Sequence, residues 1–135
     1  MKAFRMGLMA VLMLAGAGSA SANEHAARVF FISPQDGATV GREVDVRMGA
    51  EGVTVEPAGA VHSHAGHHHL IIDGQPIPAG QVVPKDATHL HFGKGQTETR
   101  LKLTPGEHTL TLQFANGHHE SYGPALSQTI HIKVQ

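Results

Sequence analysis

The segment His108-Thr-Leu-Thr-Leu-Gln-Phe114 alternates polar and apolar side chains, and this period of two is typical of a β-strand. Its two leucines and its phenylalanine would share one face, opposite two threonines and a glutamine. A second strand-like segment, residues 97–103, precedes it across the turn Thr104-Pro-Gly106. The two segments together predict a β-hairpin with an apolar face.

Similar segments occur along the rest of the chain, separated by turns rich in Gly and Pro. Those expected to be strands are Arg28–Ser33 and residues 43–48, 67–73, 88–92 and 126–134. The loop 52–66 has room for one further short strand. No amphipathic helix and no repeat interrupts the pattern. About seven short strands predict an all-β fold, a single immunoglobulin-like β-sandwich.

The N-terminus has the features of a secretory signal peptide. Lys2 and Arg5 precede an uncharged apolar run, residues 6–17, and Ala20-Ser-Ala22 follows as a small-x-small cleavage site. The run is well short of the roughly 20 residues that a transmembrane helix needs. No Cys follows it to carry a lipid anchor. We therefore expect residues 1–22 to be removed, and residues 23–135 to form one domain in the periplasm without a membrane anchor.

The charge of the mature part excludes some partners. Without the leader, 8 basic and 11 acidic side chains remain, and no basic run is present. A nucleic-acid partner is therefore not expected. Because the chain has no Cys, the domain must fold without disulfides. No segment identifies a protein partner.

Histidine is strongly enriched, with 12 residues that all lie beyond the leader. On a strand, residues i and i+2 face the same way, so a His-x-His pair can share one metal ion. Two such pairs lie on expected strands, which makes His67, His69, His89 and His91 the main candidate ligands. His68 would face the opposite side with Leu70. Secondary candidates are His68, His118, His119 and Glu98.

Several histidines have interpretations other than strong metal binding. His131, between Ile130 and Ile132, is expected to be solvated, and His108 to be a surface or hydrogen-bonded residue. His62 and His64 lie in a loop and would be weak ligands. For the paired histidines, the alternative to ligation is a hydrogen-bonded network that ties strands together.

A separate metal site is possible at the new N-terminus. Cleavage after Ala22 would expose Asn23-Glu-His25, a free amine with His in third position. The amine, two deprotonated amides and the imidazole can surround Cu(II) or Ni(II) in a square plane. Cleavage after Ala20 would abolish this site.

The side-chain donors that are available limit which metal ion the site can hold. Cys is absent and Met48, the only methionine beyond the leader, falls on an inward-facing strand position. Cu(I) prefers thiolates or thioethers, so it fits poorly. Imidazole suits Cu(II), zinc and Ni(II), and an exported domain meets oxidised copper; Cu(II) is favoured, with Zn(II) close behind.

Three ordered motifs resemble a known family. They are Gly66-His-His-His-Leu-Ile-Ile-Asp73, His89-Leu-His-Phe-Gly-Lys-Gly-Gln-Thr-Glu98 and Leu103-Thr-Pro-Gly-Glu-His-Thr-Leu-Thr-Leu112. They are similar to segments of exported bacterial proteins that carry the domain of unknown function 4399, over nearly all of the mature chain. The resemblance implies a fold and a compartment more than an activity. The matching residues are His67, His68, His69, Asp73, His89, His91, Gly95, Gln96, Glu98, Pro105, Gly106 and His108.

The chain departs from that family before its last strand. Where relatives tend to have a second His and paired prolines, this chain reads His118-His-Glu-Ser-Tyr-Gly-Pro-Ala-Leu-Ser127. If that loop supplies a ligand in relatives, His119 or Tyr122 would stand in for it here.

Three functions are compatible with these features. The leading one is a periplasmic protein that buffers or delivers copper or zinc through clustered histidines. The second is a non-metal interaction or structural module whose histidines form a network or sense pH. The third is a metal-dependent enzyme, in which His-x-His with Gln96 and Glu98 would form an open site of three protein ligands plus water. It is less expected because Glu98 follows the His89 and His91 pair at a longer spacing than in double-stranded β-helix oxygenases, and no nucleophile elbow or phosphate loop is visible.

Overall fold

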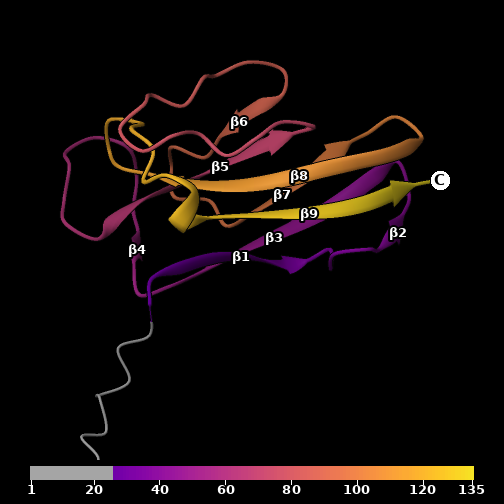
Figure 1. The fold of residues 1–135 in the computed structure, drawn as a ribbon, viewed down its shortest axis with the longest axis horizontal. Coiled ribbons are helices and arrows are strands. Elements are labelled where there is room, and N and C mark those ends of the chain that lie inside the picture. The colour runs from indigo at the N-terminus through magenta and orange to yellow at the C-terminus, as the bar shows by residue number, and fades with distance from the viewer. Residues whose placement is uncertain (1–25) are drawn as a thin grey trace, which may run out of the picture.

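The computed structural model describes residues 26–135 of the 135-residue chain, so the expected leader and the Asn23 and His25 site lie outside the described residues. The described part is built from strands, with one short 3-10 turn, η1 (Pro124–Leu126) (Figure 1). Within residues 26–135 no helix is long and apolar enough to cross a membrane. The all-β sandwich expected from the sequence is confirmed; the loop 52–66 holds the further short strand, Thr54–Val55, and the two-residue strand Thr39–Val40 is additional.

Two sheets form the sandwich. The smaller has the strand order β1 (Arg28–Ser33), β3 (Glu43–Glu51) and β7 (Glu98–Lys102). The larger has the order β2 (Thr39–Val40), β9 (Ser127–Val134), β8 (Gly106–Ala115), β5 (Ala65–Ile72) and β4 (Thr54–Val55). The short strand β6 (His89–His91) also pairs with β5. In Figure 1, β5 and β6 lie at the side of the molecule opposite β1.

The core lies between the sheets and follows from alternation along each strand. In β3, the side chains of Val44, Val46 and Met48 are buried and those between them are exposed. Leu112 and Phe114 of β8 meet them from the larger sheet, within one continuous apolar cluster. Burying such side chains contributes roughly 1.5–3 kcal/mol each.

The expected hairpin between residues 97–103 and 108–114 is wrong. β7 pairs with β3 in the smaller sheet, whereas β8 pairs with β5 and β9 in the larger one. Both segments carry leucines that are buried, among them Leu101 and Leu110. Because the chain crosses from one sheet to the other, both apolar faces enter the same core. Gly106, with a φ of 123°, allows the backbone to make this crossing.

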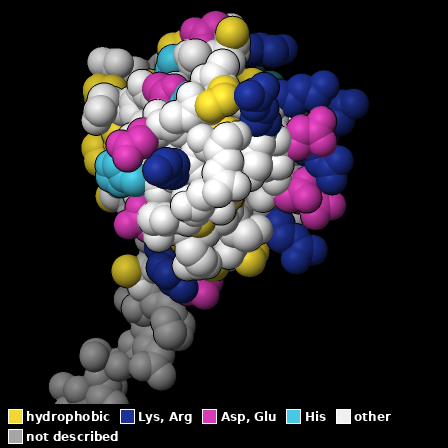
Figure 2. Space-filling view, turned by 90° about the vertical axis from the view of Figure 1, so that its right-hand side faces the viewer, with side chains coloured by type: hydrophobic (Ala, Val, Ile, Leu, Met, Phe, Trp, Pro, Cys, Tyr) yellow, Lys and Arg dark blue, Asp and Glu magenta, His cyan; other side chains and the backbone are white. Residues whose placement is uncertain are grey.

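The outer faces of the two sheets differ. That of the smaller sheet is solvated and carries ion pairs, such as Asp45 with Arg100 at 2.8 Å. Figure 2 shows basic and acidic side chains interspersed on one side of the molecule. In the larger sheet, Thr129, His131 and Lys133 of β9 are exposed, but the outer face of β5 and part of β8 is covered by two loops that bond to the side chain of Gln113. Its Nε2 donates to the carbonyl of Gly123 at 2.9 Å, and its Oε1 accepts from the backbone N–H of Ile77 at 3.0 Å. This cover encloses space on the outer side of β5.

Candidate metal centre

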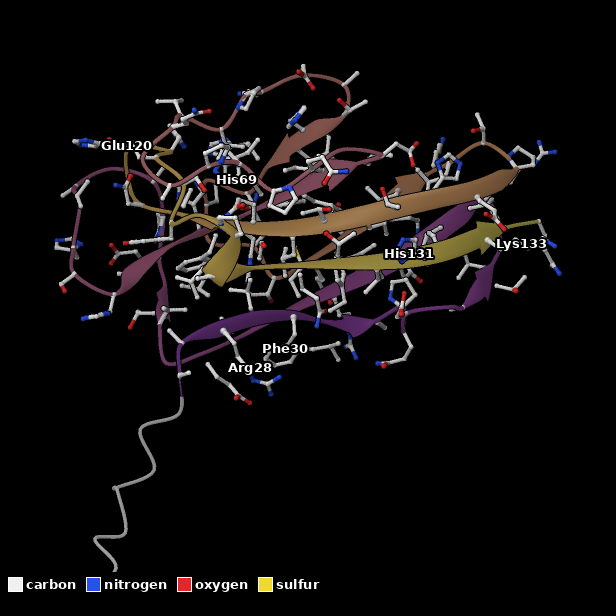
Figure 3. All side chains as sticks on the ribbon, in the orientation of Figure 1. Arg28, Phe30, His69, Glu120, His131 and Lys133 are labelled. Atoms are coloured by element: carbon white, nitrogen blue, oxygen red, sulfur yellow. The ribbon has the colours of Figure 1, made fainter. Side chains whose placement is uncertain are left out.

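His67 and His69 both lie on the covered outer face of β5. The alternation of the strand places them there and turns His68 into the core, as the sequence predicts. Both rings are almost wholly buried, at 0% and 1% exposure. Figure 3 shows His69 among the side chains between β5 and the covering loops. Gly66 precedes them, and a Cβ there would overlap the carbonyl of Ala115, so β5 needs glycine at this position to lie against β8.

His91 reaches the same space from β6. In the antiparallel ladder it stands directly opposite His69, so the two rings come together with centroids 5.1 Å apart. Gly93 lies just beyond it, and a Cβ at Gly93 would overlap the His91 ring. The glycine therefore leaves room for the orientation that the ring adopts.

His119 comes from the loop between β8 and β9. The side-chain oxygen of Asn116 accepts the backbone N–H groups of His118 at 2.9 Å and Glu120 at 3.1 Å, which holds the loop in a tight turn. His119 itself has a φ of 65°, and its carbonyl accepts the N–H of Val83 at 2.9 Å. These bonds fold the loop back over β5 and aim the His119 ring at His67.

These residues form the four-histidine cluster: His67, His69, His91 and His119. One ring nitrogen from each lies within 4.8 Å of the others. The Nε2 of His67 is 3.0 Å from the Nε2 of His69 and 3.0 Å from the Nδ1 of His119. A tetrahedral ion with metal–nitrogen bonds of about 2.0–2.1 Å holds its ligand nitrogens roughly 3.4 Å apart. The four histidines thus lie close enough to bind a metal ion.

Burial favours the uncharged form of three of these rings, those of His67, His69 and His91. Desolvation, with the neighbouring histidines adding to it, lowers the pKa of His67 to about 4 and that of His69 to about 3. Desolvation also lowers the pKa of His91, with smaller contributions from His119 and Lys85. Neutral imidazole is the form that offers a lone pair to a metal, so at neutral pH these three rings are in the ligating state.

His89 does not join the cluster, although the sequence made it a main candidate. Its Nδ1 is 2.8 Å from a carboxylate oxygen of Asp86, and its backbone N–H donates to the same oxygen at 2.9 Å. These contacts hold the His89 ring against Asp86, three residues earlier, and away from the cluster. His119, a secondary candidate in the sequence, occupies the fourth position instead.

The other secondary candidates lie elsewhere. His68 packs edge-on against Phe114 in the core, where both of its ring nitrogens are buried without a hydrogen-bond partner. His118 is exposed, with its Nδ1 3.9 Å from Glu120. Glu98 lies on β7, in the other sheet, exposed and 3.8 Å from Arg47.

Three of the four remaining described histidines pair with carboxylates, and the fourth, His64, is exposed in the loop before β5. His62 lies 2.7 Å from Glu56, His108 2.8 Å from Asp73 and His131 3.5 Å from Asp36. The interpretation of His131 as solvated and of His108 as hydrogen-bonded is confirmed, since the His131 side chain is 75% exposed.

A hollow beside the four-histidine cluster was not indicated by the sequence. It has a volume of about 380 Å³ and is lined by His69, His91, His119 and the segment 82–85. No local motif marks this segment, because its role depends on the loop fold that brings it over β5.

Comparison with known proteins identifies a family and a fold. A family model described as "Domain of unknown function (DUF4399)" matches residues 46–135, which include all four cluster histidines. Among solved structures, the endo-β-1,4-mannanase from Thermotoga petrophila is similar, with a TM-score of 0.52 and 16% identity. That match covers 86% of this chain but 21% of the mannanase chain, so this chain spans about a fifth of that protein and the likeness concerns the fold alone. No curated protein matches the sequence.

Proposed function

The chain belongs to the family of the domain of unknown function DUF4399, and we propose that it is a periplasmic protein that buffers or delivers Cu(II) or Zn(II) through its four-histidine cluster. The observation that carries the proposal is the convergence of four ring nitrogens within 4.8 Å of one another. Two strands and one loop supply these rings, so the folded domain brings together residues that are up to 52 positions apart.

The contacts inside the cluster favour a metal over a hydrogen-bonded network. The Nε2 of His67 lies 3.0 Å from two other ring nitrogens at once. A single ring nitrogen either donates one proton or accepts with one lone pair, so it cannot serve both neighbours well. No carboxylate belongs to the cluster, and the Nε2 of His91 is buried without a hydrogen-bond partner. A cation between the four rings would satisfy all of the converging nitrogens together.

The donor set favours Cu(II) or Zn(II). All four candidate ligands are imidazoles, which suit both ions. Met48 is buried in the core between the sheets, within the apolar cluster, so it offers no thioether to the site. A site of nitrogen donors alone is poorly suited to Cu(I).

The number of ligands favours storage or transfer over zinc catalysis. Catalytic zinc sites keep three protein ligands and leave the fourth position to water or substrate. Here four histidines converge, which would fill a tetrahedral zinc ion. A periplasmic location is supported by the leader-like features of residues 1–22. The Asn23 and His25 site remains a separate prediction.

The test is metal content. Untagged protein is purified from the periplasm, loaded with limited Cu(II) or Zn(II), dialysed and analysed. We expect about one retained ion per chain, lost when all four cluster histidines are replaced by Gln. The matched control replaces four histidines outside the cluster, His62, His108, His118 and His131, and is expected to keep the ion.

Two results would overturn the proposal. One is the absence of any retained ion in the wild-type protein. The other is an ion that the cluster variant still holds but that disappears when the N-terminal amine is blocked, which would move the function to Asn23 and His25. Far-UV circular dichroism of each variant verifies that the β fold is intact, and the single variant His91→Gln, at a half-buried position, repeats the comparison with less disturbance of the core.

A further inference from the structure

The hollow beside the cluster is a built feature of the fold. The segment 82–85, which lines it, is bonded to the His119 loop at its start: the N–H of Val83 donates to the carbonyl of His119 at 2.9 Å, and the N–H of Ser121 donates to the carbonyl of Gln81 at 2.8 Å. Val83 is buried, whereas Val82 is 63% exposed at the mouth. The wall and the His119 loop are thus bonded to each other, and together with His91 of β6 they line a space of about 380 Å³.

The charge of this space is positive once a metal is bound. Imidazole binds a metal as a neutral donor, so a divalent ion held by the four rings would keep its full charge. No Asp or Glu is among the residues that line the hollow, whereas Lys85 is. Within residues 26–135, Lys85 has no carboxylate partner, and its charge acts on His91. The hollow therefore attracts an anion.

The residues that line the hollow favour a ligand that has an apolar part as well as a negative charge. Val82, Val83 and Pro84 give the hollow an apolar side opposite the rings of His69, His91 and His119. An inorganic anion has no group to place against that side, whereas a short carboxylate has an apolar body and a charged end. Burying each CH₂ group contributes about 0.8 kcal/mol to transfer out of water. Low polarity at the wall also strengthens the attraction between an anion and the ion.

Resting on the proposed metal function, we infer that the hollow binds a small aliphatic carboxylate as a fifth ligand of a Cu(II) ion in the cluster, since Cu(II) accepts tetragonal coordination whereas four histidines would fill a tetrahedral zinc ion. One carboxylate oxygen would coordinate the ion on the side that faces the hollow. The other would meet the ammonium group of Lys85, and the aliphatic body would lie against Val83 and Pro84.

The experiment uses the protein loaded with Cu(II), whose visible and electron paramagnetic resonance spectra report its ligands. Titration with butyrate is expected to change both spectra saturably, and acetate is expected to bind more weakly by about tenfold because it lacks two CH₂ groups. Lys85→Ala is expected to weaken butyrate binding by about three- to tenfold, with the copper content unchanged. The matched control is Lys102→Ala, an exposed lysine on β7 in the other sheet.

The outcomes separate this inference from the proposed function. If copper is retained stoichiometrically but the spectra do not respond to butyrate, the carboxylate site is wrong and the metal function stands. Equal effects of Lys85→Ala and Lys102→Ala, or binding of chloride as tight as that of butyrate, would also overturn it. If the cluster retains no copper, the failure appears before any carboxylate is added and belongs to the proposed function, so the inference falls with it.

Discussion

The two faces of β5 place adjacent histidines in different surroundings. His67 and His69 face outward, where rings from β6 and the β8–β9 loop meet them. His68 faces inward and packs against Phe114 among hydrocarbon side chains. Desolvation lowers the pKa of His67 and His68 alike, to about 4 in each. A depressed pKa therefore does not distinguish a candidate ligand from a core residue; the convergence of other ring nitrogens does.

The largest effect is expected from removing a ring on the outer face. Replacing His69 by Ala should lower the affinity for Cu(II) or Zn(II) by more than about 100-fold, because ligand loss exceeds the 10- to 100-fold typical of outer-shell changes. Isothermal titration or competition with a chelator measures the change. His68→Leu is the matched variant on the inner face and should stay within about threefold of wild type. Equal losses of metal affinity in the two variants would contradict the assignment of the metal site to the outer face of β5.

A smaller loss of affinity is expected when a ring is displaced but kept. In Gly93→Ala, the added Cβ would overlap the His91 ring and force it to move. We expect metal affinity to fall by about tenfold, in the range of changes to groups that orient ligands. Gly41→Ala is the control, since a Cβ there meets nothing within 4 Å. Unchanged affinity in Gly93→Ala would show that the cluster does not need His91 in this orientation.

On the inner face, the expected effect is on stability. Both ring nitrogens of His68 are buried without a hydrogen-bond partner, which costs free energy that an apolar side chain does not incur. His68→Leu should therefore raise the free energy of unfolding by about 1–2 kcal/mol. Urea denaturation of metal-free protein measures this. A loss of stability would mean that the ring makes an interaction that leucine cannot replace.

The smallest effect concerns a histidine that faces a carboxylate. The hydrogen bond to Asp73 raises the pKa of His108, and the carbonyl of Thr104, 2.8 Å from its Nε2, adds to this. A raised folded-state pKa stabilises the protein below the ordinary value of 6.5, and this contribution is lost as the pH rises through the raised value. In metal-free protein, the stability lost in His108→Gln should therefore be larger near about pH 5.5 than near about pH 8.5.

Urea denaturation at both pH values checks this, with His64→Gln, at an exposed position that forms no ion pair within residues 26–135, as the control. A difference between wild type and His108→Gln that is constant or grows with pH would contradict the assignment.

Local patterns predict much of the fold. The bounds of β1 and the alternation along β3 follow from the sequence, as does the outward direction of His67 and His69. The pairing of β7 does not, because leucines on one face fit a hairpin and a crossing between sheets equally well. At the site, nothing local distinguishes His119 from His118; the Asn116 turn decides which ring points inward. Nor does the His-x-His spacing reveal that Asp86 holds His89 away.

We propose the four-histidine cluster as the metal site of this protein. Its most direct test is a crystal structure of the Cu(II)-loaded protein with data collected for anomalous scattering from copper. We expect one strong anomalous peak on the outer side of β5, within about 2.0–2.2 Å of ring nitrogens of His67, His69, His91 and His119. An empty cluster with peaks only at exposed histidines such as His62 or His118 would contradict it.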